Sequence, residues 1–137
     1  MGMRRRSREI ALQMLFQSEF GPKDNPAEQL ARFASGFEVE SDALAYAEQL
    51  VVGIFTQKGQ VDALIARESA HWKTSRMALV DLNVMRIAAF EMRLMDPAVP
   101  SNVAINEAVD LAKKYGSSDS GAFVNGILDQ LARSVRT

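Results

Sequence analysis

The sequence predicts an all-α protein with seven helices in a single domain. Apolar residues recur three and four positions apart along most of the chain, and no segment shows the strict alternation of a half-buried strand. Proline, glycine and capping residues divide the chain into pieces of helical length. Its 137 residues, 47% hydrophobic and 24% charged, suit one globular domain with a real core. We therefore expect residues 1–137 to form one compact helical domain.

Four helices are predicted in the N-terminal half of the chain. The second has the clearest start, because Asn25 can cap it and Glu28 stands where a capping box places its acid. The other three are bounded mainly by glycine and by their apolar periodicity. They cover Arg5 to Phe20, Ser41 to Gly59 and Val61 to Ala70.

Three further helices are predicted in the C-terminal half. The fifth, from about Ser75 to Met95, is apolar on nearly all sides, and a helix without a polar face belongs in the middle of a fold. The sixth is expected to begin with a cap at Ser101 or Asn102, and the seventh with a cap at Ser118 or Asp119.

The stretch "GSSDSGAFVNGILDQL" places Asn125 and Gly126 inside the last helix. Asn-Gly is a strong hairpin signal between alternating apolar residues, but Phe123 and Ile127 recur at helical spacing instead. Glycine inside a helix costs about 1 kcal/mol relative to alanine, so it needs a reason. We expect close packing of Gly126 against the first helix near Ala11. Asn125 is expected to hydrogen-bond either the preceding loop or a nucleic acid.

Charge is distributed unevenly along the chain, although the net charge is only −1. The segment from Asp24 to Glu48 is mainly acidic. Local clusters rather than totals create the potentials that attract phosphates. The basic cluster lies within one and a half turns of the first helix and comprises Arg4, Arg5, Arg6 and Arg8.

No motif indicates catalysis or a bound metal. The chain has no cysteine, which excludes disulfides, thiol catalysis and cysteine-based zinc sites. Its one histidine, His71, has no catalytic partner in the pattern and is interpreted as a surface or packed residue. The serines of "GSSDSG" are interpreted as a helix-capping loop, because the lysine and preceding strand of a phosphate-binding loop are missing. We expect a protein that is not an enzyme and that needs no cofactor or metal.

The remaining polar patterns indicate an ordinary water-exposed surface. Glu107 and Asp110 stand at pairing distance from Lys113 and Lys114, which favours a solvated ion-pair face on the sixth helix.

No stretch approaches the roughly 18 uninterrupted apolar residues of a membrane span. No cleavable leader is recognised, so a cytoplasmic protein is expected.

Three segments resemble the NusB family of transcription antitermination factors in order and spacing. They are "RRRSREIALQMLFQ", "VDLNVMRIAAFEM" and "VPSNVAINEAVDLAKKYG" followed by "FVNGILD". The resemblance implies seven helices in two packed bundles and binding of boxA RNA together with NusE, a small-subunit ribosomal protein. It further implies that the pair joins RNA polymerase and other Nus factors, notably on ribosomal RNA operons.

The resemblance also assigns roles to particular residues. Asp81 matches an acidic position that faces NusE, although a plain surface acid is the alternative. From spacing alone Phe123 would be a core residue, whereas the family places it in the RNA-binding surface, where it can stack on a base. Two departures are the longer connection "LMDPAVPSN" and Ala122 at a position where relatives can carry a basic residue. The full set of implied RNA contacts is Arg4, Arg5, Arg6, Arg8, Lys113, Phe123 and Asn125.

Two other functions fit the same pattern. One is an RNA-free helical adaptor, or a homodimer that covers its own RNA surface as some NusB relatives do. The other is the NusB-like accessory domain of an RNA methyltransferase. The end of the chain at Thr137 and the lack of a cofactor-binding βαβ pattern argue against the second.

Overall fold

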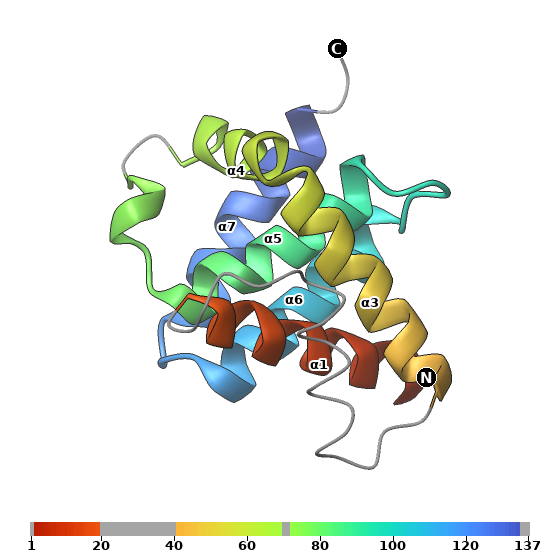
Figure 1. Ribbon diagram of the computed structural model, residues 1–137. Coiled ribbons are helices and arrows are strands. Elements are labelled where there is room, and N and C mark those ends of the chain that lie inside the picture. Colours follow the sequence, from red (N-terminus) through yellow and green to blue (C-terminus); the bar gives the residue numbers. More distant parts are fainter. Residues whose placement is uncertain (1, 20–40, 70–71, 135–137) are drawn as a thin grey trace.

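The computed structural model describes residues 2–19, 41–69 and 72–134, and this part of the chain is built from α-helices (Figure 1). It contains no strand, which confirms the predicted all-α class for the described residues. A short 3-10 helix, η1, covers Thr74–Arg76. The predicted second helix lies outside the described residues. The described residues form six α-helices: α1 (Gly2–Ser18), α3 (Ser41–Thr56), α4 (Lys58–Arg67), α5 (Leu79–Arg93), α6 (Ser101–Tyr115) and α7 (Ser120–Arg133).

Helix α5 lies at the centre of the fold, as its lack of a polar face predicts. Every residue from Asp81 to Met92 is buried. Helices α1, α3, α4, α6 and α7 all contact α5 (Figure 1). Helix α1 also packs on α3, and α6 packs on α7, so that α5 is shared by two helical groups. The N-terminal basic helix and the C-terminal helix pair are therefore held by one common element.

The polar side chains within buried α5 are satisfied by neighbouring helices. Arg86 is almost fully buried, and its guanidinium forms hydrogen bonds to Asp62 of α4 at 2.8 and 3.1 Å. The same group contacts Glu19 beyond α1 at 3.2 Å and Asn83 one turn back at 2.9 Å. A buried charge is tolerated only when it is paired and hydrogen-bonded. Arg86 therefore joins α5 to both α4 and the end of α1.

The start of α5 differs from the prediction by about one turn. The helix begins at Leu79 rather than Ser75, because Thr74–Arg76 forms the separate helix η1. Met77 and Ala78 are extended, with ψ angles of 148° and 138°, and they separate η1 from α5. The apolar pattern continues through this break, so periodicity alone could not reveal it.

Several predicted helix caps are also corrected. Pro100, not Ser101, occupies the cap position of α6, and its carbonyl accepts the amides of the first turn. Asp119 takes the predicted cap position of α7, but its side chain makes no capping hydrogen bond. Gly59 does not end α3; the break falls at Gln57, and Gly59 lies in the first turn of α4.

Gly126 lies inside α7, as predicted, but the packing reason expected for it is wrong. A Cβ atom placed at Gly126 would meet no described atom of another helix or loop within 4 Å, and the residue is exposed. The close approach of two helices occurs elsewhere, at Gly53 of α3. A Cβ there would clash with the ring of Phe90 on α5. Gly53 is therefore the glycine that packing requires.

These two glycines should respond oppositely to alanine. Gly126→Ala should raise the free energy of unfolding by about 1 kcal/mol, because alanine is the better helix former and has space there. Gly53→Ala should lower it by about 1–3 kcal/mol, because the ring of Phe90 must move. Urea denaturation of both variants measures the difference. A destabilised Gly126→Ala protein would contradict the open surface at this position.

Candidate nucleic-acid interface

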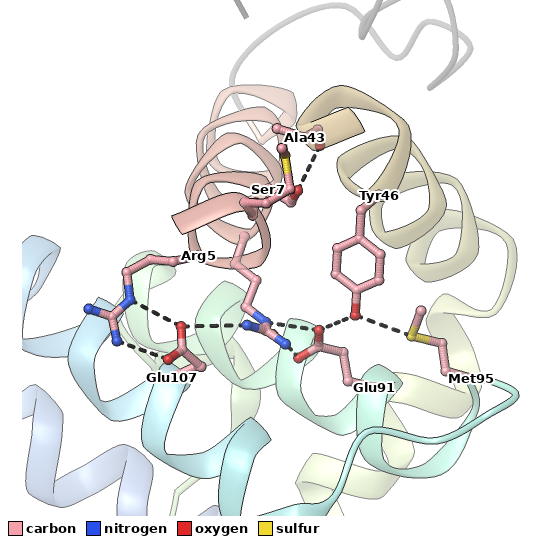
Figure 2. Close-up of polar contacts among 9 residues, drawn as sticks. Arg5, Ser7, Ala43, Tyr46, Glu91, Met95 and Glu107 are labelled. Carbon is pink, nitrogen blue, oxygen red and sulfur yellow. Dashed lines mark hydrogen bonds and ion pairs between the residues drawn. The ribbon is translucent and has the colours of Figure 1, made fainter. Parts of the chain in front are cut away.

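A buried ion pair fixes the N-terminal part of α1 on the core (Figure 2). The Arg8 side chain is only 6% exposed, and its Nε donates to both carboxylate oxygens of Glu91, at 3.1 and 2.9 Å. The hydroxyl of Tyr46 on α3 donates to the same carboxylate at 2.5 Å. A second guanidinium nitrogen of Arg8 lies 3.5 Å from Glu107 of α6. Arg8 thus belongs to the interior, which corrects the expectation that its charge faces phosphates.

Burial governs the protonation of this network. It raises the pKa of Glu91 above its ordinary value, while Arg8 and the Tyr46 hydroxyl partly offset the rise. Burial and the hydrogen bond to Glu91 also raise the pKa of Tyr46 above that of a free tyrosine. Tyr46 therefore stays neutral and remains a donor to Glu91 throughout the physiological range.

Arg5 links α1 to the acidic face of α6. Its guanidinium donates to Glu107 at 3.1 and 2.9 Å and to Asp110 at 2.8 Å. The hydrogen bond and the charge of Arg5 lower the pKa of Glu107 despite its partial burial. The two acids were expected to pair with Lys113 and Lys114 along their own helix. They pair with Arg5 of α1 instead. About half of the Arg5 side chain remains exposed in this pair.

Arg4 and Arg6 hold their charges at the surface. The Arg4 guanidinium lies over the ring of Tyr46, 3.8 Å from the centroid, in a cation–π contact. Arg6 is 44% exposed and lies 3.8 Å from Glu9, at the outer limit of an ion pair. Arg4 and Arg6, with the exposed half of Arg5, form the basic edge of α1. Of the four arginines in the basic cluster predicted from the sequence, three are therefore exposed and Arg8 is buried.

The basic edge continues to the turn between α6 and α7. Lys114 donates to Glu9 of α1 at 2.6 Å, and the Tyr115 hydroxyl donates to the same acid at 3.1 Å. Lys113 is exposed, and its aliphatic stem lies against Gly121, 3.0 Å from the position of a Cβ there. These contacts place the end of α6 between the basic edge and the start of α7.

Phe123 lies in the first turn of α7, where the sequence predicts it. It is half-buried and packs on the core, yet its ring also contacts Trp72. The ring centroids are 6.0 Å apart and the planes meet at 87°. Phe123 therefore packs on the core, as its spacing predicts, and also remains partly exposed at the surface. Asn125 is exposed and makes no hydrogen bond to another described residue, so the loop contact weighed for it is not found.

The serine cluster builds the turn before α7. The Ser117 amide donates to the Ser120 hydroxyl at 2.9 Å, and Ser120 is buried. No side chain caps the first amides of α7, and such amides favour anions. His71 lies outside the described residues. Within the described part, no group of three His, Cys, Asp or Glu side chains could hold a metal, and no helix could cross a membrane.

A second surface lies beside the basic edge. It is a groove of about 260 Å³ formed by Leu12, Gln13, Phe16, Gln17, Val80 and Tyr115. Phe16 and Tyr115 are 37% and 40% exposed, which is unusual for large rings. Asp81 follows Val80 in the first turn of α5. It is buried, and its Oδ1 has no hydrogen-bond partner within the described part of the chain. Sequence reasoning singled out Asp81 but missed Phe16.

Comparisons with known proteins identify the family. A model of the NusB family matches residues 5–133. The chain belongs to the NusB family. Among curated relatives, the transcription antitermination protein NusB of Bdellovibrio bacteriovorus is 47% identical over 131 residues, covering 96% of each chain. The protein of the same name from Geobacter sp. is 43% identical and covers 98% of this chain and 97% of its own.

Solved structures of the family share the fold. T. maritima NusB is 35% identical, with a TM-score of 0.83, and covers 95% of this chain and 90% of its own. A crystal structure of the antitermination factors NusB and NusE in complex with double-stranded RNA is 25% identical, with a TM-score of 0.85 over 98% of both chains. The resemblance seen in the sequence is confirmed.

Removal of the buried arginine should destabilise the protein far more than removal of an exposed one. Arg8→Ala leaves the Glu91 carboxylate buried without its cation and should cost about 3–5 kcal/mol of unfolding free energy. Arg6→Ala, on the same helix, should change it by about 0.5 kcal/mol or less. Chemical denaturation at neutral pH tests the pair. Equal stability of the two variants would contradict a structural role for Arg8.

Proposed function

We propose that this NusB-family chain is a transcription antitermination factor that binds boxA RNA together with NusE. It then joins RNA polymerase and other Nus factors, notably on ribosomal RNA operons. The protein acts by binding rather than by catalysis, as one domain spanning residues 1–137, in the cytoplasm. Curated relatives that match over nearly their whole length carry the antitermination name, which supports this function.

A continuous surface from the basic edge of α1, across the end of α6, to Phe123 of α7 supports this proposal. Cations can position a phosphate backbone, and aromatic rings hold unpaired bases by stacking. Here the two kinds of group come from opposite ends of the sequence and are joined by side-chain contacts of α6. The proposed RNA contacts are Arg4, Arg5, Arg6, Lys113, Phe123 and Asn125. In this proposal Arg8 positions α1 and does not touch RNA.

The groove beside α1 is the proposed NusE surface. A buried carboxylate oxygen without a hydrogen bond is costly, and such atoms are rare in folded proteins. A basic side chain of a partner that approached the first turn of α5 would be attracted to the Asp81 carboxylate, whose Oδ1 forms no hydrogen bond to another described residue. The exposed rings of Phe16 and Tyr115 would supply apolar contact in the groove, which also includes Val80, the residue before Asp81. Aromatic side chains are typical of the energetic centre of a protein interface.

Salt dependence separates the two kinds of RNA contact. The double variant Arg4→Ala/Arg6→Ala should bind a boxA oligonucleotide more weakly and flatten the plot of log affinity against log salt. Each lost single-strand phosphate contact should lower the slope by roughly 0.7. Phe123→Ala should weaken binding by about 1–3 kcal/mol with the slope nearly unchanged. Fluorescence anisotropy at several salt concentrations measures both effects.

Arg67 of α4, which is exposed and lies outside both surfaces, provides the matched control for this experiment. Arg67→Ala should bind like the unmodified chain. Because Phe123 also packs on the core, the thermal unfolding of Phe123→Ala is measured as well. Its RNA affinity is compared with that of the unmodified chain only at temperatures at which the variant is folded. A folded Phe123→Ala protein with normal affinity, or a slope that the arginine variants leave unchanged, would contradict the proposed RNA surface.

The groove variants test the protein partner. Phe16→Ala and Asp81→Asn should each weaken NusE binding by more than about 1 kcal/mol, the loss that marks the energetically important minority of interface residues. Val103→Ala, an equally exposed apolar position on α6 outside the groove, should bind NusE normally. Isothermal calorimetry with purified NusE measures all three. If RNA raises NusE affinity, NusE must raise RNA affinity by the same factor. Unchanged NusE affinity in both groove variants would contradict this surface.

A further inference from the structure

An exposed tryptophan lies next to the proposed RNA surface and has no role in the function described so far. Trp72 is 55% exposed, more than any other large apolar residue that the structure describes. Large aromatic rings are rarely left in water, and exposed ones gather at binding surfaces. Trp72 is the one tryptophan in the chain.

The contact between Trp72 and Phe123 leaves an indole face open. The ring planes are nearly perpendicular, at 87°, so the edge of one ring meets the face of the other. Such a contact covers at most one face of Trp72, and the exposed fraction of the residue agrees with an open face. A flat, open ring beside a second ring provides a stacking surface for an unpaired base.

The segment that carries Trp72 is ordered and basic. The Trp72 amide donates to the Ser69 carbonyl at 3.0 Å, and the Arg76 amide donates to the Lys73 carbonyl at 2.9 Å, so η1 follows immediately. Lys73 and Arg76 are exposed, and neither forms an ion pair with another described residue. Two uncompensated cations therefore flank the indole at close sequence spacing.

We infer that Trp72 is a second base-stacking residue for single-stranded RNA, with Lys73 and Arg76 as contacts to the adjoining phosphates. This inference rests on the proposed function and extends its surface past Phe123. The combination favours RNA over a protein partner. An aromatic face flanked by unpaired cations matches a stacked base with a phosphate on either side, and any base can stack.

The single tryptophan permits a direct test by intrinsic fluorescence. A boxA oligonucleotide should quench Trp72 emission as it binds, at the same concentrations at which anisotropy of the labelled RNA reports binding.

The stacked Trp72 ring should also contribute to the affinity for RNA. Trp72→Ala should weaken RNA binding roughly 5- to 150-fold, the loss of one stacked base, with nearly the same salt slope. Trp72→Phe should restore most of that loss.

Lys73→Ala and Arg76→Ala should each lower the salt slope by roughly 0.7. Val103→Ala serves as the exposed apolar control. Circular dichroism melts verify that the Trp72 variants remain folded, which the exposure of the residue predicts. A double-mutant cycle with Phe123→Ala then shows whether the two rings act together, as coupling between contacting residues requires.

Three results would overturn the inference. In the first, the unmodified chain binds RNA without quenching of its Trp72 emission, and folded Trp72→Ala binds RNA with normal affinity. That result would remove Trp72 from the RNA surface and leave the proposed function intact. Loss of NusE binding without loss of RNA binding in Trp72→Ala would assign the residue to a protein interface. Absence of RNA binding by the unmodified chain, with and without NusE, would remove both proposals.

Discussion

One buried carboxylate, that of Glu91, organises the surface described above. It lies on the central helix, where desolvation makes a charge expensive unless donors surround it. Arg8 from α1 and Tyr46 from α3 supply those donors, so three helices meet at a single acid (Figure 2). The orientation of α1 therefore depends on an electrostatic contact in the interior.

The exposed arginines depend on the same network. Arg4 rests on the ring of Tyr46, whose hydroxyl is held by Glu91. Arg5 is oriented by Glu107, the acid that also lies next to Arg8. Arg4 and Arg5 are thus each one residue away from the buried pair, through Tyr46 and Glu107. A preorganised cation loses less side-chain entropy when it meets a phosphate than a free one does.

Helix α1 contributes to both proposed surfaces. Its first two turns carry the basic edge, and its later turns carry Phe16 in the groove near Asp81. Tyr115 of α6 touches both regions, since it hydrogen-bonds Glu9 and lines the groove. RNA and NusE would therefore meet the protein on neighbouring sides of one helix, which gives cooperative binding a short physical route.

Much of the fold could be predicted from the sequence, whereas the site could be predicted only in part. Helix α5 is apolar on nearly all sides, so its central position followed directly. The family resemblance marked Phe123 and Asp81 as candidate contacts, and that assignment stays a prediction. Arg8 was misjudged because the three arginines that precede it in the cluster are exposed, while its partner Glu91 lies 83 positions away. Gly126 was misjudged because spacing cannot show which helix face meets a neighbour. Trp72 and Phe16 acquire meaning only through residues that are distant in sequence.

Chemical-shift mapping of the isotope-labelled protein with a boxA oligonucleotide locates the RNA-binding residues one by one. The shifted signals should form one continuous surface. That surface comprises the Arg4–Arg6 segment, the turn between α6 and α7 through Phe123, and the Trp72 indole. Helix α4 stays unchanged, and the signals of the groove around Phe16 change when NusE is added. Shifts confined to α3 and α4, or RNA-induced shifts centred on the groove, would contradict the proposed RNA surface.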